Sequence, residues 1–157
     1  MKIKLIVVGK TKKSFLVEGE KEYRKRLRRY LNLEVIELPD VKNAKKKSQE
    51  EVKREESKAI LSKINATDVV QLLDENGSEF SSVSFSAYLE KLFLKSHSSL
   101  VFVIGGPYGF HDDVYERANK KIALSKMTFS HQMVRLFFIE QLYRAMTILK
   151  GEPYHHQ

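Results

Sequence analysis

The feature that most constrains the fold of this chain is a repeated alternation of two kinds of segment. A short apolar run rich in β-branched residues is followed by a longer segment with helical periodicity, and this pair occurs five times in 157 residues. Runs of the first kind are typical of strands buried in a parallel sheet, and segments of the second kind are typical of amphipathic helices. The alternation therefore predicts an α/β fold whose parallel sheet is covered by helices on both faces.

Turn and capping residues between these segments place the elements. The predicted strands are residues 2–9, 33–39, 68–74, 99–104 and, as a short fifth strand, "KMTFS" at 126–130. The predicted helices are residues 15–31, 48 to about 65, a segment that includes 85–93, a segment from Asp112 or Asp113 to Ala123, and 132–149. Ser48 with Glu51 three residues later predicts a capped helix start, and "ENG" at 75–77 predicts a turn.

Length and composition narrow the class of protein. The chain has the length of one domain, and we expect residues 1–157 to form a single one. A formal net charge of +8 favours an anionic partner, either nucleic acid or an acidic membrane surface. The absence of cysteine excludes disulfides, thiolate metal sites and cysteine nucleophiles. No apolar run approaches the roughly 20 residues of a membrane span, so we expect a soluble, cytoplasmic protein.

The stretch "VFVIGGPYGF" at 101–110 ends the predicted fourth strand with three glycines, Gly105, Gly106 and Gly109. Ligands of open α/β sheets bind at the carboxyl ends of the strands, where glycine lets a ligand approach the backbone. A tight turn without a ligand is an equally consistent interpretation of the glycines alone. The stretch lacks the Gly-Lys-Ser/Thr ending of a P-loop and the spacing of G-x-G-x-x-G, so nucleotide phosphates are a weaker expectation.

A second segment, "ALSKMTFSHQMVRLFFIEQLYRA" at 123–145, places small and hydroxyl residues before a helix. Backbone amides at such a junction are open hydrogen-bond donors. Glu140 and Arg144 lie four residues apart on one face of the helix, either as a surface ion pair or as part of a site. Because the helix is apolar on most of its sides, we expect it to pack against a second subunit as well as its own sheet.

Three stretches together, "IGGPYG", "LSKMTFSHQMVRLFFIEQLYRA" and the terminal "PYHHQ", resemble the ribosomal RNA large subunit methyltransferase H family of the SPOUT class. The likeness extends from the initial "MKIKLIVVGK" to the end of the chain. It implies a SPOUT fold with a C-terminal trefoil knot, a homodimer, and S-adenosylmethionine as methyl donor. It also implies methylation of N3 of a pseudouridine in 23S ribosomal RNA, preferably in the assembled ribosome.

The same resemblance implies which residues form the site. The cofactor contacts that it implies are Leu73, Gly106, Leu124, Ser125, Lys126, Met127, Thr128 and Phe129. Loss of the N3 proton leaves an anion on the ring, which a cation or hydrogen-bond donors would stabilise. For that role we expect Arg144, Tyr154 and His155. Glu140 is a further candidate, as a base or as the residue that orients Arg144, and the residues alone leave the proton acceptor open.

Two basic segments, 21–30 and the loop 42–47, are either solvated faces or surfaces that contact RNA phosphates. Phosphate contacts position a protein without specifying a base. The histidines, at positions 97, 111, 131, 155 and 156, lack the spacing of a metal site, so no metal is expected.

Two other classes of function remain open. One is a non-catalytic RNA-binding or ribosome-assembly factor in which the glycine turn is structural. The other is a nucleotide-binding α/β protein that uses the turn for phosphate. Specific binding of S-adenosylmethionine would separate the methyltransferase from both.

Overall fold

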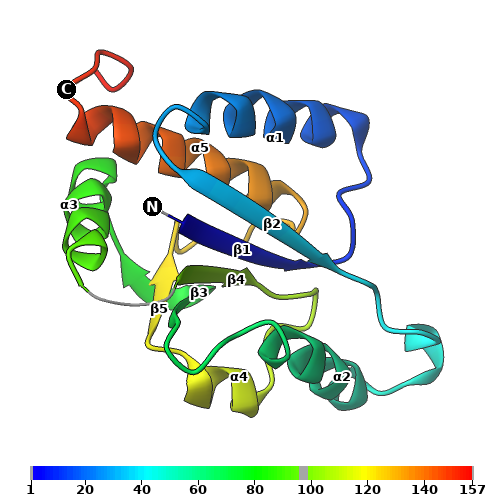
Figure 1. Cartoon of the computed structure of the whole chain (residues 1–157). Helices are drawn as coiled ribbons and strands as arrows, with labels where there is room; N and C mark the ends of the chain where they lie inside the picture. The colour runs from blue at the N-terminus through cyan, green and yellow to red at the C-terminus, as the bar shows by residue number, and fades with distance from the viewer. Residues whose placement is uncertain (1, 96–98, 157) are drawn as a thin grey trace.

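The computed structural model of the protein describes residues 2–95 and 99–156. Strands and helices alternate along the chain (Figure 1). The strands are β1 (Lys2–Val8), β2 (Asn32–Leu38), β3 (Val69–Glu79), β4 (Leu100–Ile104) and β5 (Lys120–Ala123). The helices are α1 (Ser14–Leu27), the short 3₁₀ helix η1 (Ala44–Lys46), α2 (Gln49–Leu61), α3 (Ser82–Phe93), α4 (Asp112–Arg117) and α5 (Met133–Leu149).

The strands form one sheet in the order β2-β1-β4-β3-β5, and every neighbouring pair is parallel. This confirms the predicted α/β fold with a parallel sheet. Since all these strands point the same way, the loops that follow them meet at one edge of the sheet, which we call the carboxyl edge.

Helices cover both faces of the sheet, as predicted. Helices α1, α3 and α5 lie on one face, and α2 and α4 lie on the other (Figure 1). In β1, Ile3 and Leu5 belong to the apolar cluster of the first face, whereas Ile6 and Val8 belong to that of the second. Burial on both faces explains why the strand is a nearly continuous apolar run.

Side chains cap the first turns of α2 and α4, and the cap of α4 differs from the predicted one. The Ser48 side chain accepts a hydrogen bond from the Glu51 backbone N–H (3.1 Å), so the predicted cap of α2 is confirmed. The cap of α4 is instead the ring of His111, whose Nδ1 accepts from the Asp113 N–H (3.2 Å). The expectation that Asp112 or Asp113 is the cap was wrong.

The predicted extension of this fourth helix to Ala123 was also wrong. Helix α4 ends at Arg117, and Asn119 then binds β3 with both its backbone and its side chain. Its N–H donates to the Val70 carbonyl (2.8 Å), and its Oδ1 accepts from the Val70 N–H (2.7 Å). These two bonds draw the following residues into the sheet as β5.

The remaining prediction errors concern β5 and the segments next to it. The fifth strand is Lys120–Ala123, and the segment predicted as that strand, 126–130, is a loop. The predicted turn at 75–77 lies inside β3, whose pairing with β5 shifts register between Leu73 and Ser78. Gly77 lies against the β5 backbone, where a Cβ would come 2.6 Å from the Ile122 nitrogen. The close approach of β5 therefore keeps this segment in the strand.

Among the described helices, none combines the length and the apolar character needed to cross a membrane.

Candidate active site

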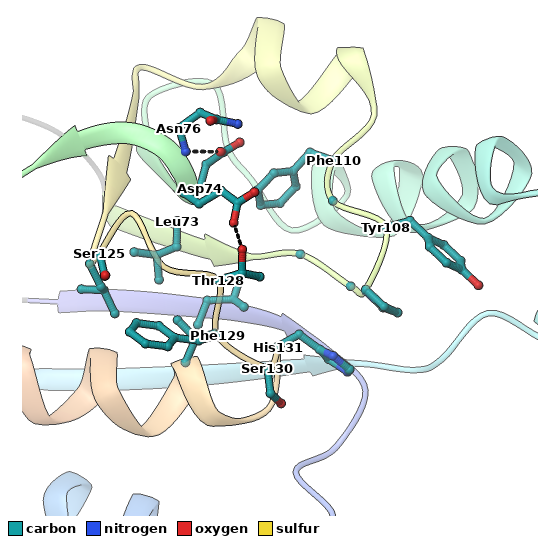
Figure 2. A pocket seen from close by; sticks show the side chains of 18 of the residues that line it. Leu73, Asp74, Asn76, Tyr108, Phe110, Ser125, Thr128, Phe129, Ser130 and His131 are labelled. Carbon is teal, nitrogen blue, oxygen red and sulfur yellow. Dashed lines mark hydrogen bonds between the residues drawn. The ribbon is translucent and has the colours of Figure 1, made fainter.

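A cavity of about 540 Å³ opens at the carboxyl edge, above β3, β4 and β5. Three segments form its walls: residues 73–76 inside β3, residues 104–110 at the end of β4 and after it, and residues 124–134 between β5 and the first turn of α5. Figure 2 shows side chains of these segments facing one another across the cavity. The volume is in the range of sites that bind cofactors and other small molecules.

The cavity brings together most of the residues that the sequence suggested for cofactor binding. The predicted residues that line it are Leu73, Gly106, Leu124, Ser125, Met127, Thr128 and Phe129. Lys126 does not line it, because its ammonium group points to solvent and lies 3.7 Å from the Glu79 carboxylate. The segment 126–130, which was predicted as a strand, is therefore a loop that forms part of the cavity wall.

The structure explains why position 106 is a glycine, which the sequence did not reveal. A Cβ at this position would lie 2.5 Å from Oε2 of Glu56, a buried residue of α2 that does not line the cavity. The glycine therefore admits the Glu56 carboxyl group behind the loop, while its backbone faces the cavity. Gly109 has a positive φ of 82°, a conformation that glycine adopts without strain.

Burial raises the pKa of Glu56 from 4.5 to about 7, and the negative charge of Asp40 adds to the shift. A raised carboxyl pKa means that the folded chain holds this proton more tightly than the unfolded chain does. Ionisation of Glu56 therefore lowers the free energy of unfolding as the pH rises from 4.5 to about 7.

We expect the Glu56→Gln variant to gain stability relative to the wild-type chain as the pH rises from 4.5 to 8. The difference in unfolding free energy should change by about 1–3 kcal/mol over this interval, because the amide has no charge to bury. Urea unfolding at one fixed protein concentration measures it at both pH values. A difference that does not vary with pH would contradict the buried, ionisable state of Glu56.

Sequence reasoning missed the acidic wall of the cavity. Asp74 accepts a hydrogen bond from the Tyr115 hydroxyl (2.6 Å) and another from the Asn76 N–H (2.8 Å). Glu75 accepts from the Thr128 hydroxyl, which joins β3 to the segment that follows β5. Burial, together with the bond to Asp74, raises the Tyr115 pKa well above its usual value. The available signal was the run "DEN" at 74–76, which directly follows the apolar residues Leu72 and Leu73.

The charges of the lining indicate what the cavity can bind. The described lining residues include Asp74 and Glu75 but no lysine or arginine. His131 also lines the cavity, and its pKa is lowered, first by burial and then by the Arg135 charge, which favours the neutral ring. Such a site suits a neutral or cationic ligand and is poorly suited to a triphosphate. This finding weighs against the nucleotide-binding alternative.

The three predicted catalytic residues meet in a separate cluster at the end of α5. Arg144 donates to Oε1 of Glu140 (2.6 Å), which also accepts from the Tyr154 hydroxyl (2.9 Å). The guanidinium lies over the Tyr154 ring, 4.7 Å from its centroid. The Tyr154 pKa is raised, chiefly by burial and by hydrogen bonds to Tyr23 and Glu140. Glu140 therefore holds both Arg144 and Tyr154 in place.

The ring of His155 completes this cluster and has one unpaired atom. Nη1 of Arg144 lies 3.1 Å from Nδ1 of His155. A guanidinium donates hydrogen bonds and accepts none, so Nδ1 is the acceptor and the neutral ring carries its proton on Nε2. Nε2 is buried and has no hydrogen-bond partner among the described residues. It is therefore an unsatisfied donor within the described chain.

The cluster and the cavity of one chain lie at opposite ends of α5. Val134 lines the cavity and Arg144 follows it by ten residues, which is about 15 Å along a helix. The structure therefore does not bring the predicted catalytic residues to the predicted cofactor residues of the same chain.

Comparison with known proteins identifies the family. A family model described as "Predicted SPOUT methyltransferase" matches residues 1–155. The chain belongs to the SPOUT methyltransferase family. It is 57% identical to the ribosomal RNA large subunit methyltransferase H of Flavobacterium psychrophilum, 55% to that of Flavobacterium johnsoniae and 54% to that of Parabacteroides distasonis. Each match covers 100% of both chains, which confirms the resemblance found from the residues.

The described part of this SPOUT chain contains no group of three or more His, Cys, Asp or Glu residues arranged to hold a metal ion. Of the five histidines considered from the sequence, His97 lies outside the described residues.

Proposed function

We propose that this protein is an S-adenosylmethionine-dependent methyltransferase that methylates N3 of a pseudouridine in 23S ribosomal RNA, on the assembled ribosome in the cytoplasm. The observation that carries the proposal is the cavity, in which the loops expected to bind the cofactor converge. Family membership and the names of the relatives support the activity and the RNA substrate.

The residues of the cavity fit S-adenosylmethionine. Apolar side chains such as Leu73, Leu124 and Phe129 offer packing for the adenosine, and the Asp74 and Glu75 carboxylates favour the positive charge of the sulfonium and the ammonium group. When bound, the cofactor supplies an electrophilic methyl group. The chain's task is to hold N3 of the base in line with that methyl group and to exclude water.

The cluster at the end of α5 supplies the groups needed at the base. Arg144 is a fixed cation, and Nε2 of His155 is an unpaired donor. Both suit the stabilisation of negative charge on the ring oxygens once N3 has lost its proton. Glu140 keeps Arg144 oriented and shares its Oε1 with Tyr154, so we assign it a positioning role.

A homodimer accounts for the distance between the cavity and the cluster. Phe129, Met133 and Phe137 are 36%, 40% and 38% exposed, and the rings of Phe129 and Phe137 are 5.1 Å apart. Phe129 also lines the cavity. A second copy that covers these apolar side chains would bring its own tail to this cavity, so each site would combine one chain's cavity with its partner's tail.

We further infer that residues 1–157 form a single domain with a C-terminal trefoil knot. The single domain is supported by one sheet that includes every described strand, and the knot is supported by membership of the SPOUT family.

The decisive experiment incubates the protein with labelled S-adenosylmethionine and ribosomes from cells that lack the cognate methyl group, with free ribosomal RNA beside them. We expect the label at N3 of one pseudouridine of 23S RNA, with ribosomes the better substrate. Binding of S-adenosylmethionine is measured separately by calorimetry. RNA binding without cofactor binding or transfer would favour the non-catalytic assembly factor instead.

A further inference from the structure

Two loops beside the cavity present lysines to solvent. The exposed lysines are Lys10, Lys12 and Lys13 between β1 and α1, and Lys42, Lys45 and Lys46 between β2 and α2. We propose that these six lysines, the edge patch, bind backbone phosphates of the substrate RNA and hold it over the cavity. The proposal rests on the proposed function, since it concerns how that substrate is held.

The strand order places the edge patch next to the cavity. The cavity lies over the carboxyl ends of β3, β4 and β5, and the sheet continues from β4 to β1 and then to β2. The two loops that carry the lysines follow β1 and β2, so they occupy the rest of the carboxyl edge. Neighbouring strands are about 4.8 Å apart. The loop after β1 therefore lies about 5 Å from β4, and the loop after β2 lies about 10 Å from it.

Hydrogen bonds fix the first lysine loop to the helix that borders the cavity. The Gln132 side chain donates to the Lys10 carbonyl (3.0 Å) and accepts from the Lys12 N–H (2.9 Å). The buried Arg135 donates to the carbonyls of Val8 (2.6 Å) and Gly9 (2.8 Å). Both residues follow His131, which lines the cavity. These bonds use backbone atoms of the loop, so its lysine side chains stay available while the loop keeps its position, which lowers the entropy lost on binding.

The charges of the edge patch are not neutralised within the described chain. None of its six lysines forms an ion pair with a described carboxylate. Lys47, in contrast, lies 2.5 Å from the Glu55 carboxylate, and we leave it out of the patch for that reason. The other basic segment, 21–30, also has acidic neighbours: Arg26 lies 3.0 Å from Glu22, and Arg29 lies 3.9 Å from Glu152. The edge patch is therefore the stronger candidate for phosphate contact.

The test compares variants that remove equal charge. One variant carries Lys10→Gln, Lys12→Gln and Lys13→Gln. The matched control replaces three exposed lysines with glutamine near the ends of α2 and α3, which run back toward the opposite edge of the sheet: Lys58, Lys63 and Lys91. For each protein, the affinity for ribosomes lacking the methyl group is measured between 50 and 200 mM salt. Calorimetry with S-adenosylmethionine checks that the cavity of each variant is intact.

We expect the edge variant to bind ribosomes about 10²-fold more weakly at 0.1 M salt, with a salt slope reduced by about 2–3, because each lost contact removes about 0.7–0.9 of slope. Its methyl-transfer rate at saturating ribosomes should stay within about twofold of wild type, as expected for a positioning contact. The control should keep the wild-type slope. Equal slopes in the two variants would overturn the proposal. If the wild-type chain transfers no methyl group, the proposed function fails, and the slopes still report on the patch.

Discussion

A chain that lacks Pro153 and all residues after it is expected to transfer methyl groups at least ~10²-fold more slowly than the full-length protein in a single turnover, while S-adenosylmethionine affinity changes little. The deletion removes Tyr154 and the unpaired donor on His155, and it leaves the cavity loops intact. Loss of one donor to a developing oxyanion lowers turnover by about 10²–10³-fold. A rate within threefold of the full-length protein would show that the tail has no catalytic role.

Mixed dimers test whether the tail acts in the partner's site. Chains with the Gly106→Val substitution have a damaged cavity and an intact tail, and tail-deleted chains have the reverse. If the two are inactive alone and mix statistically, about half of the dimers contain one of each and carry one complete site, which should restore about a quarter of wild-type activity. Methyl transfer after co-refolding at equal concentrations measures this. No recovery, despite demonstrated mixed dimers, would place the tail in the site of its own chain.

The Gly106→Val variant is itself expected to bind S-adenosylmethionine at least ~10²-fold more weakly, a loss of about 2.7 kcal/mol. The first side-chain carbon would lie 2.5 Å from Oε2 and 2.9 Å from Oε1 of Glu56. Because the Glu56 carboxyl group fills this space, either that group or residues 105–110 must shift, and the two further carbons of valine increase the displacement at this wall of the cavity. Calorimetry at fixed pH gives the affinity, and circular dichroism confirms that the variant is folded.

A double-variant cycle identifies the cause of that loss. Gly106→Ala alone should weaken binding about tenfold, and Gly106→Ala with Glu56→Ala should return to within about threefold of the Glu56→Ala variant, because the second change removes the group that the new carbon would meet. Gly109→Ala is the matched control, since its Cβ would meet nothing within 4 Å and only its positive φ is strained. If the double variant binds as weakly as Gly106→Ala, the contact with Glu56 is not the reason for the glycine.

Much of the fold followed from periodicity in the sequence. The strands β1, β2 and β4 and the long helix α5 begin and end within a few residues of their predicted bounds. The patterns of β1, β4 and α5 are strong because these elements bury apolar side chains along their length, and burial repeats with the period of the element itself. β2 is an edge strand in which only Leu38 is buried, and Pro39 marks its end. The glycine loop 105–109 was expected at the carboxyl edge, because it follows the predicted strand 99–104.

The weakest predictions concerned the edge of the sheet. β5 contains Lys120 and Lys121, and its sequence alone does not resemble a buried strand. The Lys120 ammonium lies 4.7 Å from the centre of the Tyr88 ring, and that of Lys121 lies 5.5 Å from the centre of the Tyr115 ring. Tyr88 and the partner strand β3 are distant from β5 in sequence, so no local pattern predicts this strand. The segment 126–130 has the better strand composition but no partner strand, and it becomes the wall of the cavity.

By itself, the sequence determined the α/β class and the parallel sheet, because these depend on patterns that each segment carries alone. The expected cofactor residues came instead from the resemblance to a known family. The tertiary structure decided what lies behind Gly106, that residues 120–123 pair with β3, and that the loop 126–130 lies beside the cavity. These facts depend on which distant segments meet. The packing of the whole chain determines which segments are in contact, so a pattern within one segment does not predict those contacts.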